Sequence, residues 1–193
     1  PSAGLLVSEL KQSDSMGGFN SSRYIYENAL MHLMGMGFLG FEKWEILDQT
    51  KQIKTINTYS TDSENLFSSL PVDTKIYSTK NGTDKLLSHV SSRWESRSIS
   101  NLRMHRANFL TSMTAEKYDQ NGILISSSEN SQEFDNFGNL TTSRLSNKDA
   151  FGTETVTTNN KYDQEQPEDW ILGRLTSTEV VFEKTGKNTI KKH

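Results

Sequence analysis

The stretch Tyr118-Asp119-Gln120-Asn121-Gly122, followed by the apolar run 123–125, indicates the fold of this chain. An aromatic ring suits the half-buried end of a β-strand. The carboxylate that follows can accept hydrogen bonds from backbone N–H groups just ahead of it, which starts a turn. The glycine accepts the positive φ that such a hairpin requires. The pattern therefore predicts a β-hairpin that turns at residues 119–122.

The same cassette recurs along the chain. A second copy, Phe134-Asp135-Asn136-Phe137-Gly138, precedes a strand-like run that starts at Asn139, and a weaker copy lies at residues 182–186. Repetition of a turn unit at irregular spacing indicates one hairpin after another. We therefore expect a mainly β protein in which long antiparallel hairpins form a curved or open sheet.

The composition agrees with a sheet that is solvated on at least one face. Of the 193 residues 33% are hydrophobic, and the mean hydropathy is -0.67, which is typical of antiparallel sheets with one wet face. The net charge of -3 comes from interspersed acids and bases, so nucleic-acid binding is not expected, and we interpret the arginine-containing stretch 93–106 as solvated surface. Cysteine is absent, which removes disulfides, thiolate nucleophiles and cysteine-ligated metals.

Strand-like runs alternate with turn signals through the whole sequence. We expect strands at residues 5–10, 24–31, 41–47, 53–59, 72–79, 85–95, 109–118, 123–134, 139–145, 153–162 and 170–182. A Ser/Gly-rich turn is expected at 13–22, and Asn81-Gly82 predicts a tight hairpin. Runs 24–31 and 85–95 also show helical spacing, but for 85–95 a strand is favoured because serine is a poor helix former. We expect a single domain over residues 1–193, with 60–71 as a weak candidate for an internal boundary.

Longer motifs point to a family. Tyr24-x-Tyr26-Glu27 is followed by Gly35-x-Gly37-Phe38-Leu39-Gly40-Phe41, and the second cassette is followed by Tyr162-Asp163 and then by Trp170-Ile171-Leu172-Gly173-Arg174-Leu175. In this order the motifs resemble the YD-repeat (Rhs) shell of insecticidal toxin-complex B components and related polymorphic toxins, over residues 24–182. Met36 departs from the pattern, which has a basic residue there, and the family's Asp-rich self-cleavage signature is absent.

The resemblance implies a hollow shell of long antiparallel strands around a toxic C-terminal domain. It implies a structural, encapsulating role without catalysis, in a secreted or cell-surface protein of which this chain is a segment. The implied partners are neighbouring shell segments and the enclosed C-terminal cargo. Open sheet edges would also favour edge-to-edge self-association. We expect no cofactor and, because no apolar run is long enough to span a bilayer, no membrane insertion by this segment.

The residues that we expect to carry the architecture end strands, form turns or pack rings. They are Gly35, Gly37, Phe38, Gly40, Phe41, Tyr118, Asp119, Gly122, Phe134, Asp135, Gly138, Tyr162, Asp163, Trp170 and Gly173.

Evidence for other chemistry is sparse. The four histidines are isolated in sequence and lack metal-ligand spacing. The glycines at 35–40 lack the lysine of a phosphate loop, and we attribute them to backbone crowding. A calcium site at residues 135–138 competes with the turn interpretation, which we favour because the ligand series is incomplete.

Two alternative functions stay open from the sequence. Trp44, Trp94 and Trp170 could form a stacking platform for sugars, as in an extracellular carbohydrate-binding β-sandwich. A hydrolase would need paired carboxylates, and the acidic residues available for them mostly sit at expected turns.

Overall fold

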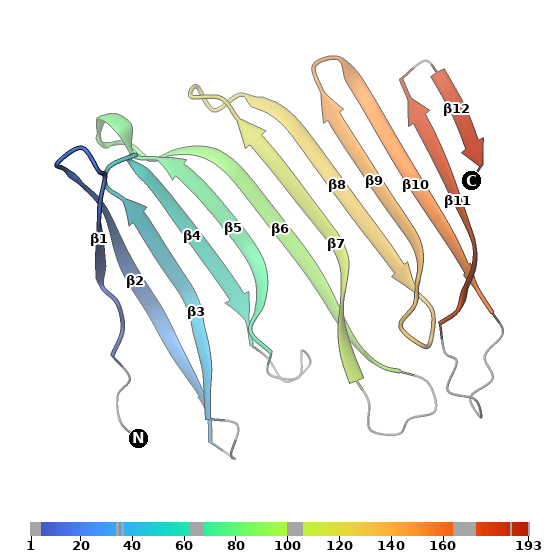
Figure 1. Ribbon diagram of the computed structural model, residues 1–193, viewed down its shortest axis with the longest axis horizontal. Helices are drawn as coiled ribbons and strands as arrows, with labels where there is room; N and C mark the ends of the chain where they lie inside the picture. Colours follow the sequence, from blue (N-terminus) through green and yellow to red (C-terminus); the bar gives the residue numbers. More distant parts are fainter. Residues whose placement is uncertain are drawn as a thin grey trace.

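The computed structural model describes residues 5–33, 35, 37–61, 68–99, 106–163, 173–185 and 187–192. These residues form one twelve-stranded antiparallel sheet whose order in space is the order in the chain (Figure 1). The strands are β1 (Glu9–Ser13), β2 (Phe19–His32), β3 (Gly37–Asp48), β4 (Ile53–Ser60), β5 (Leu70–Ser78), β6 (Lys85–Ser98), β7 (Arg106–Tyr118), β8 (Leu124–Phe134), β9 (Leu140–Asp149), β10 (Gly152–Tyr162), β11 (Leu175–Lys184) and β12 (Lys187–Lys192). A 3₁₀ turn, η1 (Lys80–Gly82), joins β5 to β6.

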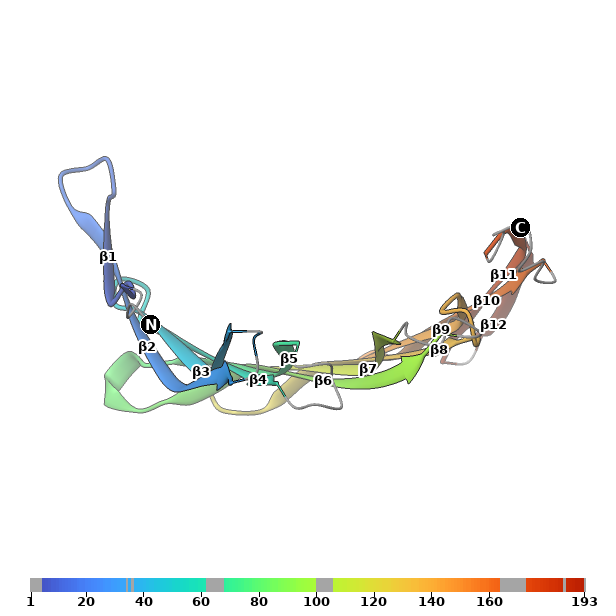
Figure 2. The same ribbon diagram turned by 90° about the horizontal axis from the view of Figure 1, so that it is seen from below.

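The sheet is a single curved layer. Figure 2 shows both ends rising on the same side of a flatter centre. A compact protein of 21.9 kDa would expose about 9,300 Å², whereas this chain exposes 13686 Å². Phe109, which is 9% exposed, is the single buried hydrophobic side chain in the described part. The predicted curved, open β-sheet is confirmed, and the alternative β-sandwich is wrong for the described residues because no second sheet covers the first.

Polar residues lie on both faces of the sheet. One row of paired residues on one face reads Asp73, Ser91, Thr114, Glu129, Ser146 and Thr155. The adjacent row on the opposite face reads Thr74, Val90, Ala115, Ser128 and Asn147. Cross-strand pairs of this kind each contribute a few tenths to about 1 kcal/mol. Backbone ladders and such pairs, rather than a central core, hold the sheet together.

Aromatic residues mark the places where the ladder changes register. Seven register shifts occur between paired strands, and six of them lie directly before an aromatic residue. These six residues are Tyr59, Tyr77, Trp94, Tyr118, Phe134 and Tyr162. A β-bulge re-aims the side chain next to it and increases the local twist. The aromatic positions therefore coincide with most of the irregularities in the ladder.

Most of the predicted strands are confirmed, and both ambiguous runs, 24–31 and 85–95, are strands. The prediction for residues 5–10 is wrong in its start, because β1 begins at Glu9. The turn predicted at 13–22 is shorter, because β2 already begins at Phe19. The hairpin predicted at Asn81-Gly82 is confirmed, because β5 pairs antiparallel with β6 across these residues, but its connection is longer than a two-residue turn. Residues 79–84 form a six-residue connection around η1, in which Gly82 has φ 72°.

Other boundaries differ at the C-terminal end. β9 continues to Asp149 rather than ending near 145, and β11 begins at Leu175. The weak cassette at 182–186 does not end its strand at the aromatic residue, because β11 runs on to Lys184. β12 was not predicted, since no alternating apolar pattern marks it. In the part of the chain that the structure describes, no helix is long and apolar enough to cross a membrane.

Candidate functional site: the cassette turns and a polar ladder

The first cassette forms a turn that its aspartate holds closed. Asp119 Oδ1 accepts hydrogen bonds from the N–H groups of Asn121 (2.7 Å) and Ile123 (2.8 Å). The Asp119 N–H donates to the Ile123 carbonyl at 2.9 Å, and Gly122 has φ 83°. One carboxylate oxygen thus satisfies two backbone donors that the turn would otherwise leave without a protein partner.

The second cassette has the same geometry. Asp135 Oδ1 accepts from the N–H groups of Phe137 (2.9 Å) and Asn139 (2.8 Å), and Gly138 has φ 87°. The Asn139 side-chain amide also donates to Asp135 Oδ2 at 2.9 Å. These bonds occupy both carboxylate oxygens, which favours the turn interpretation over a calcium site.

A third turn of this type lies within the turn predicted at 13–22, where the sequence reasoning did not identify the role of its aspartate. Asp14 Oδ1 accepts from the N–H groups of Met16 and Gly18, both at 2.8 Å, and Gly17 has φ 90°. The spacing from aspartate to the positive-φ glycine is the same as in the two cassettes, but no aromatic residue precedes Asp14. The Asp-x-x-Gly spacing alone would have identified this turn.

Backbone hydrogen bonds lower the pKa values of two of these carboxyls. The N–H of Ile123 is the main cause that holds the pKa of Asp119 below its ordinary value. The N–H of Met16, followed by that of Gly18, has the same effect on the pKa of Asp14. A hydrogen bond to the charged form favours that form, so both carboxylates are anions at neutral pH.

The aromatic residues of the two full cassettes and of the Tyr162-Asp163 pair act through different atoms. The Tyr118 hydroxyl donates to Glu116 Oε2 at 2.7 Å, and this bond raises the pKa of Tyr118. The Tyr162 hydroxyl donates to the Leu140 carbonyl at 2.9 Å. Phe134, which has no hydroxyl, packs its ring 4.8 Å from that of Phe109. Tyrosine and phenylalanine are therefore not equivalent at this cassette position.

Phe109, on β7, is the centre of a small cluster to which β6, β8 and the connection between β8 and β9 also contribute. The Arg97 guanidinium lies 4.7 Å from its ring centroid and 5.8 Å from that of Phe134, within cation–π range. Arg97 Nη2 is buried, and the described residues offer it no hydrogen-bond partner. Gly138 closes the cluster, because a Cβ there would be 3.2 Å from Phe109 Cζ. The interpretation of the stretch 93–106 as solvated surface is wrong for Arg97, whose guanidinium lies over the Phe109 ring. No motif marks Phe109 as the centre of this cluster.

The second cassette lies close to the later motifs, of which residues 162–163 and 173–175 are described, at one rim of the sheet. A Cβ on Gly173 would lie 2.6 Å from Asn139 Oδ1. Asp163 receives the Arg174 guanidinium and donates its own N–H to the Arg174 carbonyl at 2.9 Å. Residues far apart in sequence are thus brought together here, whereas the connection between β7 and β8, which holds the first cassette, lies at the opposite rim (Figure 1). Trp170 lies outside the described residues.

The glycine-rich stretch near β3 behaves differently from what we expected. Gly35, Gly37 and Gly40 all have positive φ, at 108°, 78° and 121°. Nothing lies within 4 Å of a Cβ added at Gly35 or Gly37, so crowding is not the reason for glycine at these two positions. Their backbone conformation is the reason, because L side chains rarely adopt it. At Gly40 the Ser69 hydroxyl would be 3.3 Å away, so crowding contributes there.

The aromatic residues after this stretch line a shallow pocket. Phe41 packs against Tyr26 with ring centroids 4.8 Å apart and against Phe38 at 5.2 Å. Tyr26, Phe41, Trp44, Tyr59 and Ser69 line a pocket of about 320 Å³. Trp94 lies on β6, where its indole N–H donates to the Pro71 carbonyl at 2.8 Å. Two strands, β4 and β5, separate it from Trp44.

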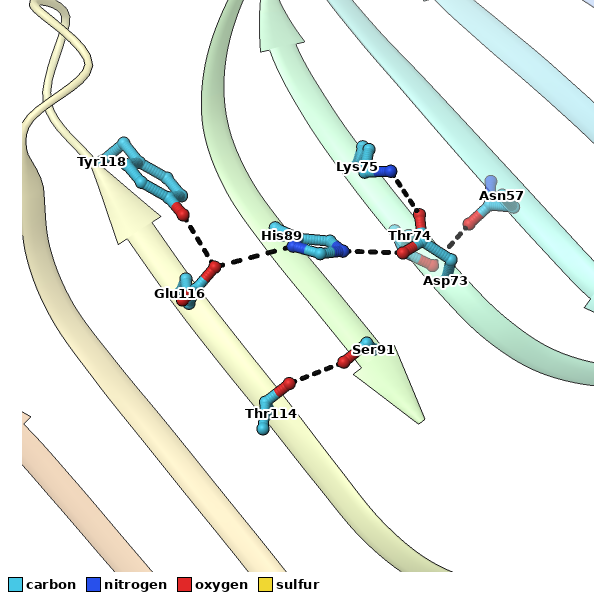
Figure 3. Close-up of polar contacts among 9 residues, drawn as sticks. All are labelled: Asn57, Asp73, Thr74, Lys75, His89, Ser91, Thr114, Glu116 and Tyr118. Carbon is cyan, nitrogen blue, oxygen red and sulfur yellow. Dashed lines mark hydrogen bonds and ion pairs between the residues drawn. The ribbon is translucent and has the colours of Figure 1, made fainter. Parts of the chain in front are cut away.

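A polar ladder crosses β5, β6 and β7 in the middle of the sheet (Figure 3). His89 Nε2 lies 2.6 Å from Asp73 Oδ1, and His89 Nδ1 lies 3.6 Å from Glu116 Oε2. Lys75 Nζ is 3.2 Å from Asp73 Oδ2. On the same face, two residues further along β6, the Ser91 hydroxyl lies 2.6 Å from that of Thr114 on β7. His89 is thus not isolated in space, although it is isolated in the sequence.

The arrangement of the ladder limits its chemistry. Its two carboxylates lie on opposite sides of the imidazole, each facing a different ring nitrogen. The Nε2 distance is that of a hydrogen bond, whereas the Nδ1 distance is that of an ion pair only. Across the described residues, no group of three or more His, Asp or Glu side chains is placed to hold a metal ion. The geometry suits a link between strands.

Solved structures share this fold, although no family model and no curated protein matches the sequence. TcdB2-TccC3 without its hypervariable C-terminal region has a TM-score of 0.69 at 10% identity, over 91% of this chain and 12% of that chain. A TcdB2-TccC3-Cdc42 structure has a TM-score of 0.66 at 11% identity, over 91% and 13%. A Tc holotoxin pore of Photorhabdus luminescens has a TM-score of 0.64 at 10% identity, over 86% and 12%.

This chain therefore has the fold of one part of these toxin-complex proteins, and it spans about an eighth of their length. At this level of the fold, the resemblance to a YD-repeat shell region that the motifs predicted is confirmed.

Proposed function

We propose that this chain is a wall segment of a YD-repeat-type β-shell in a secreted or cell-surface, toxin-like protein. The observation that carries the proposal is a twelve-stranded single-layer sheet with no core of its own, which matches TcdB2-TccC3 over 91% of this chain. A single-layer sheet that is held together by backbone hydrogen-bond ladders can separate the solvent on its two faces, as the wall of a container must.

We further propose that the segment performs no reaction. The carboxylates of the cassettes are bonded to their own turns, and the imidazole of the ladder is held between two carboxylates. The acidic residues and the histidine are thus engaged in holding backbone and strands. On this proposal the fifteen motif residues named in the sequence analysis stabilise turns and strands and take no part in a reaction.

The proposed partners are adjoining shell segments and a C-terminal cargo. β1 and β12 are the outer strands of the sheet, and an outer strand offers unpaired backbone groups to another strand. TcdB2-TccC3 matches with a TM-score of 0.66, and its form without the hypervariable C-terminal region with 0.69. The matched fold is therefore not part of that region, which supports a separate role for the wall.

The structure of the native polypeptide that contains this chain tests the proposal. Electron cryomicroscopy is expected to show the sheet continuing past β1 and β12 into a closed shell. Protease protection of a C-terminal region, lost when the shell is opened by denaturant, would support enclosure. A native protein in which both outer strands face solvent would contradict the proposal.

Carbohydrate binding is a second candidate function, which the aromatic pocket favours. Tyr26, Phe41, Trp44 and Tyr59 surround Ser69, and aromatic rings beside a hydroxyl are typical of sugar-binding faces. A glycan array separates the two candidates. Binding that Trp44→Ala abolishes and Trp94→Ala leaves intact would support a sugar site, and no binding to any glycan would exclude it.

A further inference from the structure

We propose that Asp73, His89 and Glu116 form an acid-dependent clasp that holds β5, β6 and β7 together, and that Tyr118 positions Glu116 within it. The clasp joins three neighbouring inner strands of the sheet (Figure 3). It goes beyond the wall role and does not depend on it, because it rests on contacts inside this chain.

The two contacts of the imidazole require two protons. Nε2 faces Asp73 Oδ1 at 2.6 Å, and Nδ1 faces Glu116 Oε2 at 3.6 Å. A neutral imidazole carries one N–H, whereas the imidazolium carries two. In the neutral form, one ring nitrogen therefore turns a lone pair towards a carboxylate oxygen. Only the charged form makes both contacts attractive, so protonation strengthens the link across the three strands.

The burial of the three side chains sets the size of the effect. They are 25%, 27% and 38% exposed for Asp73, His89 and Glu116. Their contacts are thus partly shielded from solvent, but water still screens them. Ion pairs with this degree of exposure typically contribute up to about 1 kcal/mol.

Charged and polar groups face the imidazole from both neighbouring strands. β5 contributes the Asp73 carboxylate and the Lys75 ammonium, and β7 contributes the Glu116 carboxylate and the Tyr118 hydroxyl. Lys75 pairs directly with His89 in the register, and its positive charge would repel an imidazolium. Its ammonium lies 3.2 Å from Asp73 Oδ2, which leaves Oδ1 to the imidazole.

Tyr118 connects the first cassette to the clasp. Its hydroxyl donates to the same Glu116 oxygen, Oε2, that faces His89 Nδ1. The register shift before Tyr118 accompanies this placement of its ring. Tyrosine in this cassette therefore orients a carboxylate, which phenylalanine, the residue of the second cassette, could not do.

Amide hydrogen exchange across β5 to β7 tests the clasp. Protection factors, corrected for intrinsic exchange, are compared at about pH 5.5 and about pH 8, on either side of the ordinary imidazole titration. We expect β6 amides to be about 2- to 5-fold better protected in acid. His89→Gln should remove this difference, and the control His32→Gln, on β2, should preserve it. An equal pH dependence in the unchanged protein and in His89→Gln would overturn the proposal.

Two further variants keep the test decisive if His89→Gln does not fold. Tyr118→Phe keeps the ring and removes the hydroxyl, so part of the acid protection should be lost. Lys75→Met removes the opposing charge and should enlarge the difference. Nitrogen-15 spectra of the His89 ring in the unchanged protein should show both nitrogens protonated at about pH 5.5. A single neutral tautomer at that pH would overturn the clasp.

Discussion

Gly138 lies against the ring of Phe109, so that a Cβ added to this glycine would be 3.2 Å from Phe109 Cζ. Gly122 occupies the equivalent position of the first cassette with nearly the same φ, 83° against 87°, but nothing lies within 4 Å of its Cβ position. Substitutions at these two glycines therefore distinguish the cost of backbone strain, which both share, from the cost of displacing a packed ring, which arises only at Gly138.

Gly138→Ala should therefore cost more stability than Gly122→Ala. Both variants place an L residue at positive φ, which costs about 1 kcal/mol or more. Only Gly138→Ala also displaces the Phe109 ring, which should bring its total loss to about 2–3 kcal/mol. Urea denaturation of the two variants and the unchanged protein measures both losses. Equal losses would show that Phe109 does not constrain this turn.

Acid should weaken the first cassette through Asp119. Its pKa is lowered in the folded protein, mainly by the Ile123 N–H. A group with a depressed folded pKa contributes stability above its unfolded pKa, about 3.9, and loses it as the pH falls through the folded value. Asp119→Asn keeps an acceptor oxygen and removes the titration. Below about pH 4 the unchanged protein should therefore lose more stability than this variant. Parallel pH profiles in thermal unfolding would contradict the assignment.

The hydroxyl of Tyr162 should contribute a small, measurable amount. It donates to the Leu140 carbonyl at 2.9 Å, which also accepts from Asn160 Nδ2 at 3.0 Å. Because the carbonyl keeps a partner, Tyr162→Phe should cost about 0.5–1 kcal/mol. Tyr59→Phe serves as a control, since no hydrogen bond of its hydroxyl is observed among the described residues. A loss of the same size in both variants would indicate a general effect of the substitution.

The outer edge of β1 should drive self-association of the isolated chain. Tyr24 N–H donates to the Ser8 carbonyl at 2.9 Å, so by the alternation of antiparallel pairs the N–H of Lys11 points away from β2. Lys11→Pro should block this edge and leave the internal ladder intact. Sedimentation velocity is expected to show concentration-dependent oligomers that this variant reduces. Monomer alone at high concentration would rule out edge pairing.

Much of the fold could be predicted because hairpins depend on local sequence. The aspartate and glycine of each cassette determine the turn, and alternation or β-branched residues indicate the strands on either side. The exceptions are also local. Asn81-Gly82 resembles a tight hairpin, but residues 79–84 form a longer connection with a 3₁₀ turn. Short, polar edge strands such as β12 carry no apolar pattern from which to predict them.

The side-chain clusters could not be predicted, because they depend on register between strands. His89 reaches Asp73 and Glu116 only because β5, β6 and β7 pair as they do, with register shifts that no sequence pattern shows. Arg97 and Phe109 meet for the same reason. The cassette pattern identified Tyr118, but it did not identify Glu116 as the residue whose carboxylate the Tyr118 hydroxyl orients.

The order of the strands in space follows their order in the chain, and this has a mechanical consequence. Each strand contacts mainly the strands just before and after it. Such an array responds to load as a series of nearest-neighbour links. Tension applied at the two termini should detach hairpins one by one from the ends, so that the interior strands are the last to separate from their neighbours.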